Sequence, residues 1–246
     1  MDEILGGIDV SENADPESAP KHTMKRRIVH APLIEDAKDA SGWSADVRIK
    51  ARVEKGNGAC VFMVDRPVLE GLSAWFAGEK AAEHSPLAKA LFAVEGVETV
   101  LIHGYTVTVA RSPVVRGDWK PMAQEIGRVI REHLVEGRPV VDEAYVAAMP
   151  PSEEIRERLQ NVLDMEINPA IASHSGAILL DRVEGNTVYI QMTGGCQGCA
   201  ASDITLRQGI HDSFRSAVPQ IGAILDVTDH DAGKNPFYKE LPAGMR

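Results

Sequence analysis

The stretch Thr193-Gly194-Gly195-Cys196-Gln197-Gly198-Cys199-Ala200-Ala201-Ser202 holds two of the three cysteines of this chain, in C-x-x-C spacing. The residues before it, 187–192, alternate between apolar and polar side chains, which predicts a half-buried strand. After it, apolar side chains recur at helical spacing at Leu206, Ile210, Phe214 and Ala217. The stretch is therefore predicted to be a glycine-rich turn between a strand and a helix.

Both cysteines are expected at the N-terminus of that helix. Amide N–H groups at this end have no partner within the helix and carry a partial positive charge, which stabilises a thiolate and lowers the pKa of a thiol. Gly194, Gly195 and Gly198 leave room for a bulky group near the backbone. These features indicate a pair of exposed metal or redox ligands, Cys196 and Cys199. Gly194 and Gly195 are candidate cofactor-binding residues through their backbone N–H groups.

The spacing alone leaves several uses of the two cysteines open. A strand, a turn, C-x-x-C and a helix also describe a thioredoxin-like redox site, although no proline lies between these cysteines and the strands before them form a hairpin rather than a βαβ unit. Four cysteines from two chains can instead hold a structural zinc ion. Spacing does not distinguish zinc from an iron–sulfur cluster, and the cysteines can also be inert.

Composition restricts the class of protein. The chain has 246 residues, enough for about two domains at the usual ~100–200 residues each. A formal net charge of −10 argues against non-specific nucleic-acid binding, and no apolar run reaches the length of a membrane span. The acidic first residues resemble neither a secretory signal nor a transit peptide. Three cysteines make a poor disulfide framework, so a cytoplasmic, reducing compartment is expected.

Along the chain, the pattern predicts an α+β fold of two small α/β-layered domains. We expect a mostly disordered N-terminal segment, a first domain, a proline-punctuated linker, a second domain with the cysteines, and a tail: 1–44, 45–137, 138–151, 152–230 and 231–246. The apolar residues of the linker can dock on either domain.

The first domain is predicted to contain strands and two helices. Residues 47–53 alternate as in a strand with one solvent-facing side, and residues 59–64 are apolar enough for a buried strand. Cys60 lies in that second strand and is expected to behave as a small hydrophobic residue. Two further strands are expected to form a hairpin around residues 103–104.

The helices of the first domain are predicted from their caps. Ser85 and Asp118 are expected to be the N-caps of two helices. Gly96 and Gly137 are expected to lie just past the ends of these helices.

The second domain is predicted to run helix, strand, strand, helix, strand. Ser152 is expected to cap the first helix, and Asn168-Pro169 to break it. Residues 177–182 and 221–227 are the predicted strands besides the one that leads to the cysteines.

Two histidines and three tryptophans are candidates for a functional role, but a structural or solvent-exposed role is the simpler expectation for each. His211 and His230 can lie behind the cysteines, but a solvated side chain is the expectation for both. Trp43, Trp75 and Trp119 are expected to pack rather than to form a stacking platform.

Both halves of the chain resemble known domains. Residues 152–230 resemble the NifU C-terminal domain, on the motif Gly194-Gly195-Cys196-Gln197-Gly198-Cys199 and on Asp229-His230 with Asn235-Pro236. Residues 57–137 resemble the Nfu N-terminal domain, on Pro67-Val68-Leu69, Ser85-Pro86-Leu87-Ala88, Leu91-Phe92 and Val94-Glu95-Gly96-Val97. One departure is Gly56-Asn57-Gly58, where members often have an Asn-Pro-Asn turn. In this order the domains resemble Nfu-type iron–sulfur cluster carriers.

The resemblance implies a non-enzymatic carrier that holds a labile [4Fe–4S] cluster through Cys196 and Cys199 and passes it to apo-proteins. Such a cluster generally takes four thiolates, and one chain offers two at this site, so a homodimer bridged by the cluster is expected. The implied partners are iron–sulfur scaffold proteins as donors and apo iron–sulfur enzymes as clients, with no nucleic acid and no membrane. The first domain shows no chemistry and is assigned to recognition of donors or clients, or to modulation of dimerisation.

Overall fold

The computed structural model describes residues 47–54, 58–172, 176–194 and 203–228. The predicted N-terminal segment, the Gly56-Asn57 turn and the tail lie outside these residues, as do Trp43 and His230. The described chain is a mixture of helices and strands, which confirms the predicted α+β class. No helix in these ranges is both long enough and apolar enough to cross a membrane.

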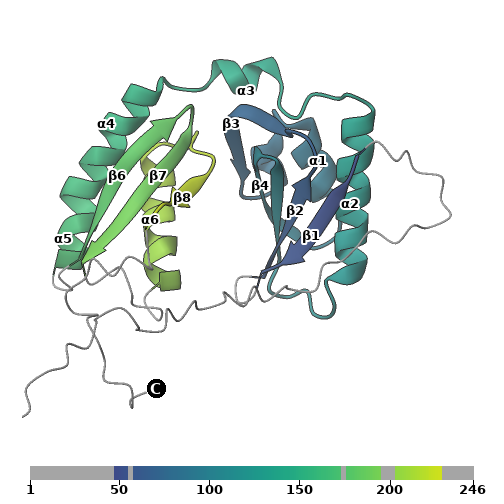
Figure 1. Cartoon of the computed structure of the whole chain (residues 1–246), viewed down its shortest axis with the longest axis horizontal. Helices are drawn as coiled ribbons and strands as arrows, with labels where there is room; N and C mark the ends of the chain where they lie inside the picture. The colour runs from purple at the N-terminus through teal and green to yellow at the C-terminus, as the bar shows by residue number, and fades with distance from the viewer. Residues whose placement is uncertain (1–46, 55–57, 173–175, 195–202, 229–246) are drawn as a thin grey trace, which may run out of the picture. The chain divides into compact units, whose positions relative to one another are not determined.

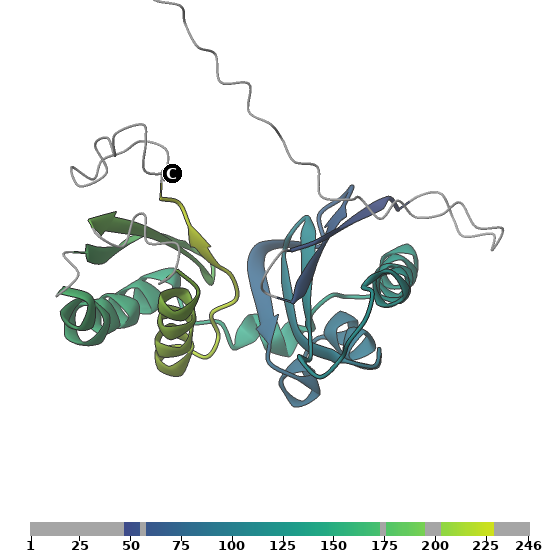
Figure 2. The ribbon, with the colours of Figure 1, turned by 90° about the horizontal axis from the view of Figure 1, so that it is seen from below.

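The first domain is an antiparallel sheet with helices on one face. Its elements are β1 (Ile49–Val53), β2 (Ala59–Val64), β3 (Leu69–Phe76), the short 3₁₀ helix η1 (Glu79–Ala82), α1 (Pro86–Phe92), β4 (Val97–Gly104), β5 (Thr106–Arg111) and α2 (Lys120–Val135). The strand order is β1-β2-β5-β4-β3, and neighbouring strands are antiparallel. Figures 1 and 2 show α1 and α2 on the same face of the sheet.

Alternation along the strands builds the first core. Cys60, Phe62 and Val64 of β2 are buried with apolar residues of both helices, such as Leu91 and Ile126. The strand pattern and the hairpin between β4 and β5 are therefore confirmed. Cys60 is fully buried, as expected of a small hydrophobic residue.

The strand β3 was not predicted from the sequence. This strand pairs with β4, but its register shifts between Leu69 and Ser73, and Gly71 within the shift has a φ of 72°. Such a bulge disrupts the alternation of side chains from which a strand is recognised.

Helix ends in the first domain agree only in part with expectation. Ser85 is the N-cap of α1 and its Oγ accepts a hydrogen bond from Ala88 N at 3.1 Å. The expected stop at Gly96 is wrong, because α1 ends at Phe92 and Gly96, with a φ of 87°, instead precedes β4. Gly137 follows the end of α2 as predicted, with a φ of 64°.

The start of α2 lies one residue later than predicted. Trp119 occupies the N-cap position, and the carboxylate of Asp118 accepts a hydrogen bond from Lys120 N at 3.1 Å. Asp118 therefore still satisfies one free N–H of the first turn, from one position further back.

The segment after α2 packs on the first core. It contains the short helix α3 (Glu143–Ala147), which Asp142 caps by accepting a hydrogen bond from Tyr145 N at 2.9 Å. Val140, Val141 and Tyr145 pack against the first core. These linker residues therefore dock on the first domain.

The second domain is a smaller sheet with its helices on one face. Its elements are α4 (Ser152–Val162), the π-helical turn η2 (Leu163–Ile167), α5 (Asn168–Ile171), β6 (Gly176–Glu184), β7 (Thr187–Gly194), α6 (Asp203–Ala217) and β8 (Ile224–Asp226). The strand order is β6-β7-β8, with β6 antiparallel and β8 parallel to β7. Figure 2 shows α4 and α6 beneath the same face of this sheet.

Two predictions about α4 are wrong. Pro151 occupies the N-cap position, and Ser152 is the first helical residue, whose Oγ donates to Gly185 O at 3.0 Å. Asn168-Pro169 does not end the helical path, because η2 leads directly into α5 and places Pro169 in its first turn, where the missing N–H is tolerated. The Asn168 side chain then contacts β6: it donates to Ile178 O at 3.0 Å and accepts from Ile178 N at 2.8 Å.

Candidate functional site

The segment 195–202 joins β7 to α6, and the predicted ligands Cys196 and Cys199 lie in it, together with Gly195. These three residues are outside the described ranges, so their role stays a prediction. The structure describes β7 as far as Gly194 and α6 from Asp203. The predicted strand before the cysteines and the predicted helix after them are confirmed by these two elements.

Pairing with β6 fixes the end of β7. Gly194 lies opposite Gly176, and Thr193 lies opposite Ala177, to whose carbonyl oxygen the Thr193 hydroxyl donates at 3.1 Å. Gly194 has a φ of 61°, a backbone conformation that favours glycine. The strand therefore enters the cysteine segment through a residue that needs to be glycine. Binding of a cofactor by the Gly194 N–H stays a prediction.

The other side of the segment is anchored by α6. Ile210 and Phe214 of α6 are buried in the second core. They share that core with Val188, Ile190 and Met192, which face it from β7 as the alternation predicted. The first turn of a helix has free N–H groups, and such groups stabilise a thiolate that lies near them, so the prediction for Cys196 and Cys199 stands on the position of this helix in the sequence.

Residues next to β8 tie this end of the domain together. The Thr228 hydroxyl accepts a hydrogen bond from Met192 N at 2.7 Å, and Val227 N donates to Ile190 O at 2.9 Å. Asp226 accepts from both groups of Thr228 and forms an ion pair of 3.0 Å with Arg207 on α6. The elements on both sides of the cysteine segment are thus connected through residues 226–228.

This role of Asp226 and Thr228 was not predicted from the sequence. A signal was present, because an Asp two residues before a Thr fits a turn in which the carboxylate accepts a hydrogen bond from the N–H two residues later. Nothing in the local pattern indicates the contact with Arg207.

The expectation for His211 is wrong. This side chain lies half-buried on α6, and burial lowers its pKa to about 4, with Arg215 and Arg207 contributing in the same direction. His211 is therefore neutral at pH 7 rather than a solvated, titrating histidine.

Cys60 differs from the cysteines of the motif. Burial raises the pKa of its thiol to about 11, so that it is protonated at neutral pH. A buried thiol without thiolate character is a poor nucleophile and a poor metal ligand.

Comparison with known proteins follows the two-domain division. Residues 56–137 match the family model described as scaffold protein Nfu/NifU N terminal, and residues 159–225 match the model of the NifU-like domain. The chain belongs to the Nfu family. The second match ranges across the cysteine segment and the elements on both sides of it.

Curated relatives of this Nfu-family chain carry names from iron–sulfur cluster biology. It is 29% identical over 174 residues to the human NFU1 iron-sulfur cluster scaffold homolog, mitochondrial, covering 70% of this chain and 68% of that protein. The protein of the same name from Drosophila virilis is 31% identical, over 65% of this chain and 54% of that protein. The Fe/S biogenesis protein NfuA of Stutzerimonas stutzeri is 38% identical, over 39% of this chain and 50% of that protein. The chain thus spans about half to two thirds of the length of these relatives.

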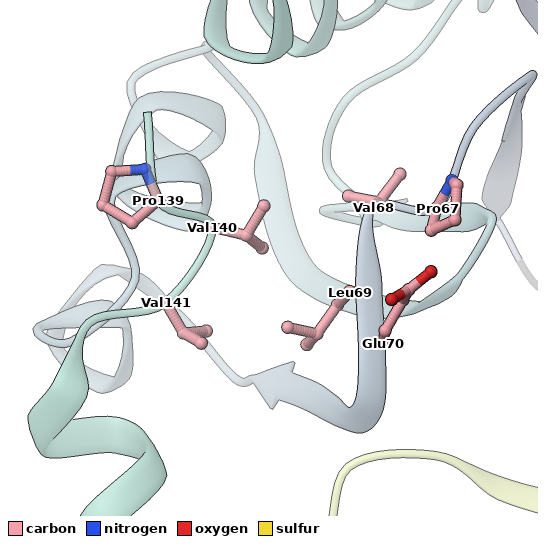
Figure 3. A pocket seen from close by; sticks show the side chains of 7 residues that line it. All are labelled: Pro67, Val68, Leu69, Glu70, Pro139, Val140 and Val141. Atoms are coloured by element: carbon pink, nitrogen blue, oxygen red, sulfur yellow. The ribbon is translucent and has the colours of Figure 1, made fainter. Parts of the chain in front are cut away.

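Away from the cysteine segment, the described residues of this Nfu-family chain were compared with what a metal site or a substrate pocket needs. Its residues include no group of three or more His, Cys, Asp or Glu side chains that could hold a metal ion. A surface hollow of the first domain lies between residues 67–70 and 139–141 (Figure 3). Its lining consists of valine, leucine and proline side chains apart from Glu70, so it has no acid–base pair with which to act on a substrate.

Trp119 has the packing role predicted for it. Its ring is buried in the first core, with the guanidinium carbon of Arg111 4.7 Å from the ring centroid. A ring covered in this way is not available as a stacking platform.

Proposed function

We propose that this chain is a non-enzymatic carrier that binds a [4Fe–4S] cluster between two copies through Cys196 and Cys199 and passes it to apo-proteins. One observation carries the proposal: the C-x-x-C segment lies between two elements of an Nfu-family domain that are both anchored in one core, and it directly precedes the N-terminus of α6. The names of the relatives support iron–sulfur cluster biology in general.

The number of ligands is the reason for proposing a dimer. A [4Fe–4S] cluster is generally held by four thiolates. The third cysteine of the chain, Cys60, is fully buried in the first core and cannot reach the motif without unfolding of that core. A second copy that brings its own Cys196 and Cys199 completes the set.

The shared site favours transfer over storage. Separation of the two chains removes half of the thiolates from the cluster at once, so the cluster can leave for an apo-protein with a better ligand set. Iron–sulfur scaffold proteins are the proposed donors and apo iron–sulfur enzymes the proposed clients. The cytoplasm is the proposed compartment, because two thiols in C-x-x-C spacing stay reduced only under reducing conditions.

The test is anaerobic reconstitution of the purified protein with iron and sulfide. We expect a brown protein with a broad absorption band near ~400 nm and about two irons per chain, as one four-iron cluster per dimer requires. Cys196→Ala and Cys199→Ala are expected to abolish binding. Cys60→Ala is the matched control and is expected to retain it.

Other outcomes would contradict the proposal. A colourless protein that holds zinc and becomes monomeric on chelation would indicate a structural zinc dimer. Reduction of insulin by the metal-free protein would indicate a thiol–disulfide enzyme. A Cys60→Ala protein that folds but takes up no cluster would show that the ligands are assigned incorrectly.

A further inference from the structure

Buried polar contacts connect β3 of the first domain with the β6–β7 hairpin of the second, and Ser73 is at their centre. All described residues belong to the same compact unit. Ser73 and Asn186 are fully buried, and Thr187 is 3% exposed. Buried polar side chains are costly unless they are hydrogen-bonded, so each of their partners matters.

One carboxamide satisfies the backbone of Ser73. Asn186 Oδ1 accepts a hydrogen bond from Ser73 N at 2.8 Å, and Asn186 Nδ2 donates to Ser73 O at 2.8 Å. The same Nδ2 donates to Gln220 O at 2.7 Å. Asn186 thus uses both ends of its side chain on specific backbone groups.

The Ser73 side chain is satisfied as well. Its Oγ accepts a hydrogen bond from Ala223 N at 2.8 Å and lies 2.9 Å from the Thr187 hydroxyl, with which it shares a second hydrogen bond. The Tyr145 hydroxyl donates to Ser73 O at 2.9 Å, and burial raises the pKa of this tyrosine to about 12. We call Ser73, Tyr145, Asn186, Thr187 and Ala223 the Ser73 lock.

Two glycines allow the backbones to approach this closely. A Cβ atom on Gly222 would overlap Ser73 Oγ and lie 2.5 Å from the Ser73 carbonyl carbon. A Cβ atom on Gly185 would overlap Gly71 O, and Gly185 also has a φ of 59°. The surfaces are therefore complementary in shape as well as in hydrogen bonding.

A cation–π contact lies beside the lock. The guanidinium carbon of Arg215, near the end of α6, is 4.0 Å from the ring centroid of Trp75 on β3. Arg215 also donates to Gly222 O at 3.1 Å, and burial lowers its pKa to about 10. This stacking is worth more away from water than on an exposed surface.

We propose that the Ser73 lock fixes the first domain on the hairpin end of the second, so that the first domain is an intramolecular docking partner and not a freely tethered module. These contacts are specific to this pair of surfaces. They need backbone groups on a bulged strand that pair with one carboxamide, and two glycines opposite that strand. A transient contact between tethered domains would not require buried polar groups such as those of Ser73 and Asn186, each of which is paired across the contact.

The position of the lock has a consequence for the cluster site, and this consequence alone rests on the proposed function. Thr187 begins β7, whereas Gly194 ends it next to the cysteine segment, roughly 20 Å away along an extended strand. Arg215 is likewise near the end of α6 that is remote from the cysteines. The docked first domain leaves the cysteine end of β7 and α6 free for a second copy.

The test is ¹⁵N relaxation on the metal-free protein, which does not depend on cluster binding. We expect one overall rotational correlation time for both domains of the wild type. Gly222→Ala should about halve that time and give each domain its own value, because each then tumbles with about half the mass. Gly209→Ala, which adds the same methyl group where nothing lies within 4 Å, should behave as wild type.

Two results would overturn the proposal. One is a wild type whose domains tumble independently, and this measurement needs no variant. The other is a folded Gly222→Ala or Asn186→Ala protein that still tumbles as one body with unchanged amide shifts around Ser73. Failure of cluster reconstitution would leave these relaxation results unaffected, so the two proposals can fail separately.

Discussion

The two ends of β7 are built in opposite ways. At the hairpin end, Asn186 and Thr187 are buried and their side chains form hydrogen bonds with Ser73. At the other end, Gly194 has a φ of 61° and is followed by residues 195–202, of which seven of eight are Gly, Cys, Ala or Ser. One strand therefore has the Ser73 lock at one end and, at the other, the segment that contains the proposed cluster ligands. A single small domain can combine a fixed docking surface with an exchangeable site if the two are separated along one strand.

The largest expected effect is the loss of bound iron when the cysteines beyond the end of β7 are replaced. Cys196→Ser and Cys199→Ser should reduce iron from about two per chain to almost none after reconstitution, since two cysteinyl ligands per chain are needed. Asn186→Ala, at the other end of β7, should retain its iron. Iron and sulfide analysis of the three variants measures this, and equal loss in all three would show that the ends are not separate.

A second variant tests the core on which both ends depend. Phe214 is fully buried in the second core, so Phe214→Ala should lower the free energy of unfolding by about 3–5 kcal/mol. Met165→Ala is the control, because Met165 is 82% exposed and its change should stay within about 0.5 kcal/mol. Urea denaturation of the metal-free proteins measures both. Similar values for the two variants would contradict the assignment of Phe214 to the core.

The stability of the second domain is expected to depend on pH through His211 of α6. The pKa of folded His211 is about 4, below its ordinary value of 6.5, so the unfolded state binds more protons between these values. The contribution of neutral His211 to stability is complete above about pH 6.5 and is lost as the pH falls towards 4, by at most about 3 kcal/mol.

His211→Gln should flatten this part of the stability profile. Denaturant titrations at several pH values from 4 to 7 measure the slope for both proteins. An NMR titration that gave His211 an ordinary pKa would remove the basis of this prediction.

The smallest expected effect is at the hairpin end. Tyr145→Phe removes a donor to Ser73 O and should lower the free energy of unfolding by about 1 kcal/mol. Tyr189→Phe is the matched control, because its hydroxyl donates to the exposed Glu184 and its loss should cost clearly less. Chemical denaturation distinguishes the two variants. If Tyr189→Phe cost as much as Tyr145→Phe, the greater importance of the buried contact would be contradicted.

Local periodicity was enough to predict most elements around the site. Alternation over residues 187–192 gave β7, and helical spacing from Leu206 gave α6. Where a bulge at Gly71 disrupted the alternation, β3 was missed. Pro169 was predicted to break the helix because proline is unfavourable in a helix interior. The π-helical turn η2, which starts a new helix at Asn168 and so places Pro169 in a first turn, cannot be recognised from the local sequence.

Contacts between residues far apart in the chain could not be predicted from the sequence. Ser73 and Asn186 are 113 residues apart, and neither belongs to a pattern that a local window detects. The candidate ligands, in contrast, came from spacing and a family resemblance, which identify residue types without any contact. For this reason Cys196 and Cys199 could be named from the sequence and the Ser73 lock could not.

The contact between Asn168 and Ile178 has a consequence for the solubility of the chain. β6 is an edge strand, and such strands expose unpaired N–H and C=O groups on which another molecule can add a strand. Asn168 occupies both groups of Ile178. Asn186 does the same for Ser73 on β3, which is an edge strand of the other sheet. In each sheet an asparagine side chain thus stands in for a neighbouring strand and protects one edge against aggregation.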